Sequence, residues 1–321
     1  MSGTRKFGIN CEPPHRARVK RLCLLCTMVF AVLLLRSFGA EATRGLPNPF
    51  FAMDTALRDL SLLDSVKELG YAGVGWKTGE PAEVATSADQ VRQRGLKLFA
   101  VYSYAPPILR TNGLHWDPRF EALMAALKDR DTVLWLPINS PDYAKSSPDG
   151  DAVAVEGLRR LADAAGSNGV RVALYPHTSF WLERVQDAVR LAKKVDRKDL
   201  GVTFNLCHCL MVGDESNISE FLAEAAPHLF LVTINGADRG AAHTSWDRLI
   251  RPLDDGSFDL VPLLKRLRAL NYTGPIGLQG YGVKLAPKEN LTRSIAAWQR
   301  LCTAAARLSS PEGQATSKQP E

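Results

Sequence analysis

Cysteine, long apolar runs and an excess of one charge are all scarce in this 321-residue chain once its first 42 residues are set aside. Three of its six cysteines remain, Cys207, Cys209 and Cys302, and an odd three is no disulfide framework. Residues 1–42 hold seven of the 40 basic and two of the 34 acidic residues, which leaves 33 and 32. Because nucleic-acid binding needs a concentrated basic face, we expect no nucleic-acid partner.

The first 42 residues have the pattern of an export signal. Basic side chains gather at positions 16–21, an apolar run covers 22–35, and Ala40-Glu41-Ala42 fits a small-residue cleavage site. We expect cleavage after Ala42 and an exported protein, periplasmic or secreted, without a membrane span. An uncleaved amino-terminal membrane anchor is the alternative. The polar, proline-bearing tail 309–321 is expected to be disordered.

Residues 43–308 alternate between short β-rich apolar runs and amphipathic segments, which is typical of repeated βα units in one domain. The expected strands are 50–54, 71–76, 97–104, 132–139, 170–177, 200–206, 228–235, and a last one from 275 to near Gly280. Helical spacing of apolar residues predicts helices within 57–70, 120–129, 154–167, 184–195 and 260–270.

Eight such units favour a closed (β/α)₈ TIM barrel. An open doubly wound sheet is the alternative, but the first strand is not followed by a glycine-rich phosphate-binding turn. In a barrel the site lies at the carboxyl ends of the strands, where the βα loops converge. The polar residues at those ends are therefore the candidates.

Two histidines follow expected strands, His177 after the fifth and His208 after the sixth. Histidine titrates near neutral pH, so both are candidate catalytic acids or bases. The alternative is that each only hydrogen-bonds a neighbouring loop. His208 lies between Cys207 and Cys209, but one histidine and two cysteines are too few ligands at unsuitable spacing for a closed zinc site. We expect both cysteines to be small buried packing residues.

A second group of candidates offers polar or aromatic contacts to a ligand. Amides combine donors and acceptors, which suits sugar hydroxyl groups, although amides also terminate strands without a further role. Sugar faces also pack on aromatic rings. The expected substrate-binding residues are Asn205, Asn235, Gln279, Tyr175, Trp181, Asp238 and Lys77.

Several motifs, in this order, resemble the xylose isomerase-like TIM-barrel superfamily. They are GYAGVGW, LYPH, FNLCH, TINGAD and the long stretch PLDDGSFDLVPLLKRLRALNYTGPIGLQ. The resemblance covers about Phe50 to Leu301 and is strongest in the carboxyl half, at Gly256, Asp259, Tyr272, Gly274, Ile276, Leu278 and Gln279. It implies a TIM barrel from a group that contains sugar isomerases, sugar epimerases and apurinic endonucleases.

The resemblance also implies a divalent-metal site of Glu, Asp, His and Glu on the fifth to eighth strands. This chain departs at all four positions, with Tyr175, Asn205, Asn235 and Gln279. Amides and a phenol bring no negative charge to offset the dehydration of a hard cation. We therefore expect no tightly bound metal or other cofactor, while a weak site of amide oxygens with His177 or His208 stays open.

Together these features predict a sugar isomerase or epimerase that works by acid/base proton transfer on a carbohydrate. In the family pattern a histidine follows the sixth-strand acid by three residues, as His208 follows Asn205, and Asp238 matches the acid of a seventh-strand motif. The alternative is a sugar-binding protein that kept the barrel without catalysis. A glycosidase would need two facing carboxylic acids, and the candidates are Asp54, Asp142, Asp238 and Glu183.

Overall fold

The computed structural model describes residues 46–307, apart from 54–59, 78–79 and 104, and it does not describe the side chains of Trp76 and Lys77. The expected export signal, the expected disordered tail, Asp54 and Tyr104 therefore lie outside the described residues, as does the side chain of the candidate Lys77. Within the described part of the chain, no helix is long and apolar enough to cross a membrane.

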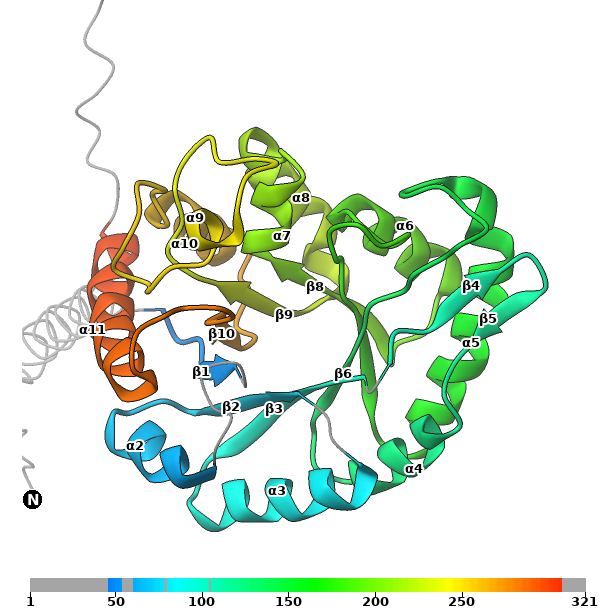
Figure 1. Ribbon diagram of the computed structural model, residues 1–321, viewed down its shortest axis with the longest axis horizontal. Coiled ribbons are helices and arrows are strands. Elements are labelled where there is room, and N and C mark those ends of the chain that lie inside the picture. The colour runs from blue at the N-terminus through cyan, green and yellow to red at the C-terminus, as the bar shows by residue number, and fades with distance from the viewer. Residues whose placement is uncertain (1–45, 54–59, 78–79, 104, 308–321) are drawn as a thin grey trace, which may run out of the picture. The chain divides into compact units, whose positions relative to one another are not determined.

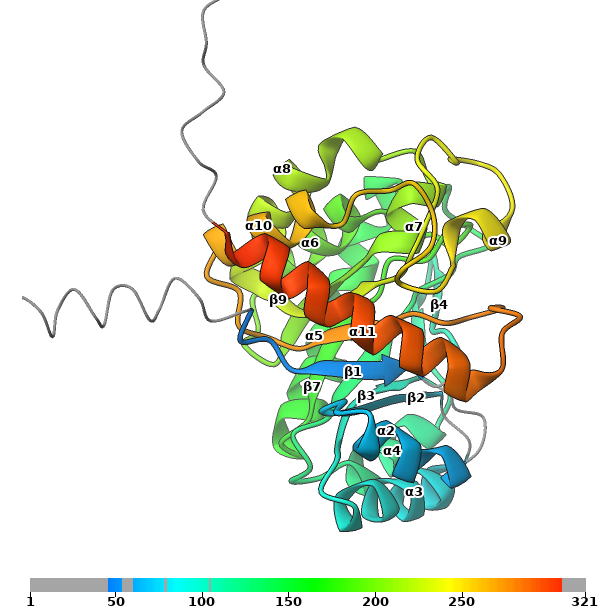
Figure 2. The same cartoon turned by 90° about the vertical axis from the view of Figure 1, so that its left-hand side faces the viewer.

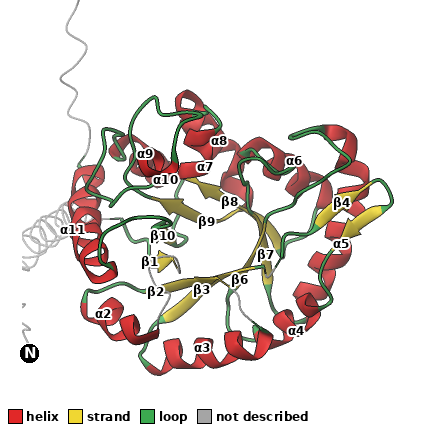
Figure 3. Ribbon diagram, in the orientation of Figure 1, coloured by secondary structure: helices red, strands yellow, loops and turns green. Residues whose placement is uncertain are grey.

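Eight parallel strands close into a barrel, and the helices surround it (Figures 1 and 3). Each pairs with its two neighbours in the order β1, β10, β9, β8, β7, β6, β3, β2. The strands are β1 (Phe50–Met53), β2 (Gly73–Lys77), β3 (Lys97–Tyr102), β6 (Val133–Leu136), β7 (Arg171–Leu174), β8 (Leu200–Asn205), β9 (Leu229–Ile234) and β10 (Ile276–Leu278). The predicted TIM barrel is confirmed.

All eight predicted strands are present, and six of them end before the predicted carboxyl-terminal residue, while the end predicted at Asp54 lies outside the described residues. Two ends have a simple cause, because Pro137 follows β6 closely and Pro176 lies just beyond β7. Proline has no amide proton to donate to a neighbouring strand. The polar residues beyond these points lie outside the named strands, although Asn139 still forms an isolated bridge with Ile108 of β4.

The longer helices lie outside the barrel and bury apolar side chains against its strands. They are α2 (Leu63–Glu68), α3 (Pro81–Gln93), α4 (Arg119–Ala126), α5 (Asp151–Ser167), α6 (Val185–Val195), α8 (Ile218–Ala225), α10 (Val261–Ala269) and α11 (Pro287–Ala306). Helix α11 crosses β1 (Figure 2), where Trp298 stacks on Phe50 with 4.4 Å between ring centroids. This aromatic contact ties the last helix to the first strand.

Aromatic side chains fill the inside of the barrel beneath the strand ends. Phe51 is fully buried and stacks on Phe99 at 5.0 Å. Its ring occupies the space left by two glycines, because a Cβ atom at Gly277 or Gly75 would lie 2.4 Å or 2.9 Å from it. The interior is therefore packed below the mouth, and a ligand can enter only from the carboxyl end.

Three short elements interrupt the βα pattern, and the sequence analysis did not predict them. Strands β4 (Ile108–Arg110) and β5 (Gly113–His115) form an antiparallel hairpin against α5. The two others, α7 (Leu206–Met211) and α9 (Trp246–Leu249), follow β8 and β9. Helices α7 and α9 both contribute side chains to the site described next.

Candidate active site at the barrel mouth

A cavity of about 350 Å³ opens at the carboxyl ends of the strands. It lies where the βα loops of a TIM barrel converge. Its lining comes from β1, β3 and the segments that follow β7, β8, β9 and β10: Met53, Tyr102, Tyr175, His177, Cys207, His208, Trp246, Ile250, Gln279 and Tyr281. The structure thus brings together four of the predicted site residues, namely Tyr175, His177, His208 and Gln279.

The two histidines lie side by side in this cavity. His177 follows β7 and is partly buried, whereas His208, in α7, is only 6% exposed. Their ring centroids are 4.3 Å apart, with 44° between the ring planes. Phe180 covers the other side of His177 at 4.2 Å. Both rings are therefore held in a packed, low-polarity environment.

The backbone of one residue, Thr178, contacts both rings and determines which nitrogen of each carries a proton. Nδ1 of His177 lies 2.9 Å from the Thr178 carbonyl oxygen, so this nitrogen must donate. Nδ1 of His208 lies 3.2 Å from the Thr178 amide, so this nitrogen must accept. In their neutral forms, His177 therefore has a lone pair on Nε2 and His208 has a proton on Nε2.

Burial keeps both imidazoles neutral. Desolvation lowers the pKa of His177 from its usual 6.5, against a smaller opposing effect of the Thr178 hydrogen bond. Burial lowers the pKa of His208 well below 6.5, and the neighbouring His177 adds to this. At neutral pH the cavity thus contains one imidazole that can take a proton and one that can donate a hydrogen bond.

Four further aromatic side chains line the cavity, and we call them the aromatic box: Tyr102, Tyr175, Trp246 and Tyr281. Tyr102 meets Tyr175 edge to face at 4.8 Å, and Trp246 meets the His208 ring edge to face at 5.2 Å. Tyr281 is 53% exposed and so marks the open side. The box gives the cavity apolar faces with a few hydrogen-bonding groups at their edges.

The three amides at the implied metal positions each hold a member of the aromatic box. Asn205 Nδ2 donates to the Tyr175 hydroxyl oxygen, and Asn205 Oδ1 accepts from the Cys207 thiol at 3.0 Å. Gln279 Oε1 accepts from the Tyr281 amide at 3.1 Å. Asn205 is 1% exposed and lies behind the lining, whereas Gln279 belongs to it.

Asn235 fastens the helix that presents Trp246. Its Nδ2 donates to the carbonyl oxygens of Gly236, at 2.9 Å, and Leu249, at 2.6 Å. Leu249 is the last residue of α9, and Trp246 is the first. Asn235 is fully buried and does not line the cavity, so its contacts are with the protein's own backbone.

These residues do not fit a hard divalent cation. The side-chain oxygens of Asn205 and Gln279 already accept hydrogen bonds. Of the three amide oxygens, only that of Asn235 is buried without a hydrogen-bond partner among the described residues. A neutral oxygen does not offset the dehydration of a dication. No group of three or more His, Cys, Asp or Glu side chains suited to a metal occurs in the described part of the chain. The weakness of any metal binding stays a prediction.

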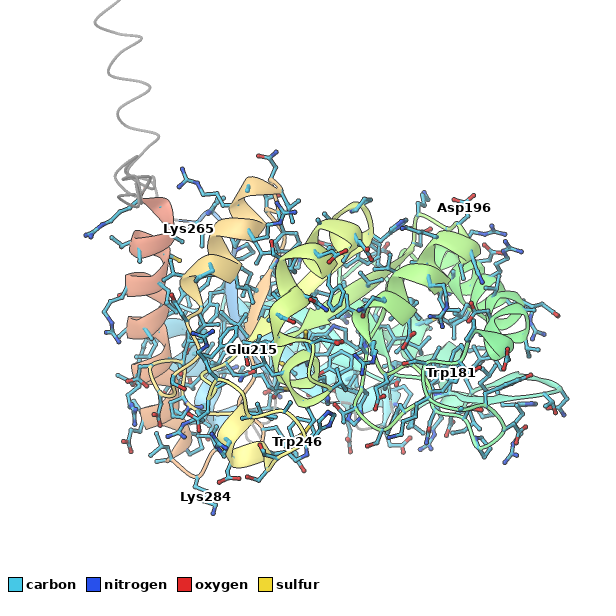
Figure 4. All side chains as sticks on the ribbon, turned by 90° about the horizontal axis from the view of Figure 1, so that it is seen from above. Trp181, Asp196, Glu215, Trp246, Lys265 and Lys284 are labelled. Carbon is cyan, nitrogen blue, oxygen red and sulfur yellow. The ribbon has the colours of Figure 1, made fainter. Side chains whose placement is uncertain are left out.

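Trp181 and Asp238 lie outside the described cavity lining, and the side chain of Lys77 is outside the described residues. Trp181 is 2% exposed and donates from Nε1 to the Ser147 carbonyl, so it is a packing residue (Figure 4 shows it well apart from Trp246). Asp238 forms ion pairs with Arg248 and Arg251 in its own loop. Neither arrangement supports the predicted contact with substrate, because the Trp181 ring is buried and the Asp238 carboxylate is paired.

Two cysteines are buried as predicted, and the described glycosidase candidates lie outside the cavity lining. Burial raises the pKa of the Cys207 and Cys209 thiols far above the usual value. Asp142 pairs with Arg110, and Glu183 pairs with Lys145. Asp54 is outside the described residues, and the described lining residues include no carboxylate that could serve as one of the two facing acids of a glycosidase.

Sequence reasoning missed Tyr102 and Trp246. Tyr102 is the last residue of β3, whereas the expected strand ran on to Tyr104. Trp246 lies between β9 and α10, and an aromatic residue in a βα segment of a barrel was an available signal. Met53 and Ile250 also line the cavity, but apolar residues at strand and loop ends carry no distinguishing pattern.

A closed parallel barrel with a histidine-bearing cavity at the carboxyl ends of its strands defines a TIM-barrel protein with its site on the βα loops. The chain belongs to the xylose isomerase-like TIM-barrel family, whose sequence pattern matches residues 63–302. The resemblance noted in the sequence is thereby confirmed. A search of curated proteins gave no match.

Solved structures at low sequence identity share the fold. A 3-keto-D-glucoside 4-epimerase from E. coli is 19% identical, with a TM-score of 0.61 over 79% of this chain and 100% of that one. A D-allulose 3-epimerase from Methylomonas sp. is 14% identical, with 0.61 over 79% and 98%. A xylose isomerase domain-containing protein from Salmonella typhimurium is 16% identical, with 0.64 over 81% and 98%.

Proposed function

We propose that this protein is a sugar isomerase or epimerase that moves a proton at the carbon next to a carbonyl group, without a tightly bound divalent metal. The observation that carries the proposal is the opposite protonation of two adjacent neutral imidazoles, set by the Thr178 backbone. The family, and the two sugar epimerases among its structural relatives, support the reaction class.

In the proposed reaction Nε2 of His177 takes the proton from the carbon beside the carbonyl. The electrons of that C–H bond form a carbon–carbon double bond, and the carbonyl π electrons move to oxygen. The Nε2 proton of His208 stabilises this oxygen through a hydrogen bond. Return of a proton to the opposite face of the same carbon gives the epimer. Return to the former carbonyl carbon gives the isomer, when the hydroxyl proton of the neighbouring carbon moves to the former carbonyl oxygen and leaves a carbonyl in its place. Atoms and charge then balance without a redox partner.

Neutral histidines are suited to this reaction in two ways. A base must be unprotonated at working pH, which the lowered pKa of His177 provides. A neutral donor stabilises a developing enolate less strongly than a dication would. We therefore infer a reaction at an already activated carbon, beside a ketone or aldehyde.

Proton exchange with solvent tests the proposal directly. Purified protein is incubated with a panel of aldoses and ketoses in D₂O, and deuterium at the carbon beside the carbonyl is followed by NMR. We expect exchange by the wild type, and a loss of about 10²-fold or more in His177→Gln and in His208→Gln. His115→Gln is the matched control, because His115 lies exposed on the β4–β5 hairpin.

Two outcomes would overturn the proposal. If both histidine variants exchanged deuterium at the wild-type rate, neither His177 nor His208 would have the role assigned to it. Saturable sugar binding by the wild type without any exchange would identify the alternative, a non-catalytic sugar-binding protein. Dialysis against a chelator should leave the wild-type rate unchanged, and a rate that returns only with added Mn²⁺, Mg²⁺ or Zn²⁺ would contradict the metal-free mechanism.

We also propose that the protein works after export. The basic and apolar pattern of residues 1–42 and the Ala40-Glu41-Ala42 motif support this. Amino-terminal sequencing of the protein from its native cells should begin at residue 43.

A further inference from the structure

The lining of the cavity becomes more exposed from the histidines to the opening. His208, with 6% of its surface exposed, lies deep, whereas Tyr281, with 53%, lies at the open side. Tyr281 is the single exposed large hydrophobic side chain among the described residues, and it lines the cavity. Its ring therefore offers an apolar face to the part of a ligand that reaches the opening. A ligand whose carbonyl faces the histidines directs its other end toward this ring.

The described lining residues offer no ion-pair partner for a charged ligand. Among the described lining residues none is Asp, Glu, Lys or Arg. A phosphate or carboxylate group would lose its water there without a compensating ion pair, which is costly. Aromatic faces instead favour ring carbons and other apolar groups.

The aromatic box is also held in place before any ligand binds. The Asn205, Gln279 and Asn235 contacts fix Tyr175, the Tyr281 backbone and the helix of Trp246 respectively. Rings already fixed in position lose less conformational entropy on binding, which increases affinity. Amides at these three positions thus support a platform for an apolar group.

We propose that the ligand is an uncharged sugar derivative that carries an apolar substituent, and that this substituent packs on Tyr281 and Trp246 at the open side. That the ligand contains a sugar rests on the proposed function. That it carries an apolar substituent follows from the residues that line the cavity. A free hexose would leave Tyr281 exposed, and a sugar phosphate would place its charge among neutral groups.

Binding of matched probes tests this inference separately from turnover. For each of several hexoses, affinity is measured calorimetrically for the free sugar, its phenyl glycoside and its 6-phosphate. We expect the phenyl glycoside of at least one hexose to bind at least tenfold more tightly than the free sugar, and the 6-phosphates not to bind. Phenyl glycosides have no open carbonyl, so they report binding without reaction.

A variant then assigns the preference to the rim. Tyr281→Ala should remove the advantage of the phenyl glycoside and leave the affinity for the free sugar within about twofold. Lys284→Ala, exposed in the same loop, should change neither. The inference would be overturned if the free and phenyl forms bound equally, if a 6-phosphate bound, or if no probe bound at all. It would also be overturned if Tyr281→Ala weakened the binding of both forms equally.

The two proposals fail in distinguishable ways. A phenyl preference without deuterium exchange of any free sugar would contradict the catalytic proposal and leave this one standing. Deuterium exchange without a preference for the phenyl glycoside would contradict the apolar substituent and leave the catalytic proposal standing.

Discussion

The protonation of His177 and His208 is controlled by a neighbouring backbone rather than by a carboxylate. The Thr178 carbonyl and amide contact the two Nδ1 atoms, at 2.9 and 3.2 Å. A carboxylate beside either ring would raise its pKa and favour the imidazolium form. The backbone fixes the tautomers without adding charge, and so it keeps both rings neutral in a buried cavity.

The pH dependence of the rate follows from these lowered pKa values. Both histidines must be neutral, and their pKa values lie below 6.5. We expect kcat/KM to be level at and above neutral pH and to fall as the pH decreases below 6.5 through the lowered values. A steady-state profile of deuterium exchange measures this. A rate that instead rises as the pH falls would show that an imidazolium is the active form.

Unfolding must be separated from this loss of activity. Below pH 6.5 the unfolded chain binds protons at histidines that remain neutral in the folded protein, so stability also falls with decreasing pH in that window. Denaturant unfolding at each pH supplies the control. The His208→Gln variant should show a weaker dependence of stability on pH there than the wild type.

At the scale of single residues, the two histidines could be predicted, because both the chemistry of histidine and its position after a strand can be recognised in the sequence. It did not predict which amides face the cavity. Asn205 ends β8 and Asn235 follows β9, but their hydrogen bonds go to Tyr175 and to the α9 backbone. Partners that lie on other elements cannot be read from residue type and spacing alone.

Among the elements, the short helix α9 is fastened in part by a buried amide. Asn235 donates to the Leu249 carbonyl at its end and to the Gly236 carbonyl in the preceding loop. A carboxylate in the same place has no proton to donate when ionised, and it would face two carbonyl oxygens. Backbone hydrogen bonds between Gly236 and Arg251 also hold the loop that bears Trp246, but only the amide supplies the two buried side-chain donors.

Replacing Asn235→Asp should loosen this loop. We expect a loss of about 2 kcal/mol or more in the free energy of unfolding, since two buried carbonyls lose their donors and a charge becomes buried. Faster amide hydrogen exchange across residues 236–251 would locate the change. Asn217→Asp, at an exposed position before α8, is the control. Unchanged exchange in the loop would show that Asn235 does not hold it.

The elements that escaped prediction have physical reasons. The β4–β5 hairpin turns at Thr111-Asn112, with Arg110 paired to Gly113, and the Asn112-Gly113 dipeptide at this point was a readable turn signal. Helix α7 covers only Leu206–Met211, too short for helical periodicity to stand out from the strand before it. The eight strands were readable because buried parallel strands are continuous apolar runs between turn residues.

For the whole molecule, closure of the barrel brings β10 against β1 and places Gly277 beside Phe51. A methyl group at Gly277 would lie 2.4 Å from the Phe51 ring, which is fully buried and cannot move outward. Gly277→Ala should therefore destabilise the protein by about 1–3 kcal/mol through overpacking. Thermal unfolding measures this.

A matched variant distinguishes the cause. Gly70→Ala changes a glycine with no atom within 4 Å of a new Cβ, although its φ of +87° adds strain of its own. Adding Phe51→Leu to Gly277→Ala should recover part of the loss, because the smaller side chain makes room. If the double variant lost as much stability as the two single variants together, direct contact between the Phe51 ring and the new methyl group would be contradicted.

The control that Thr178 exerts has a consequence for how this protein tolerates mutation. The carbonyl and the amide that contact the two imidazoles are main-chain atoms, so every natural residue except proline at position 178 would present both. The Thr178 hydroxyl adds a side-chain contact to His208 Nδ1 at 3.1 Å, which serine could keep and valine or alanine would lose. The main chain thus sets the division of roles between His177 and His208, and substitution at position 178 weakens the contact to His208 alone.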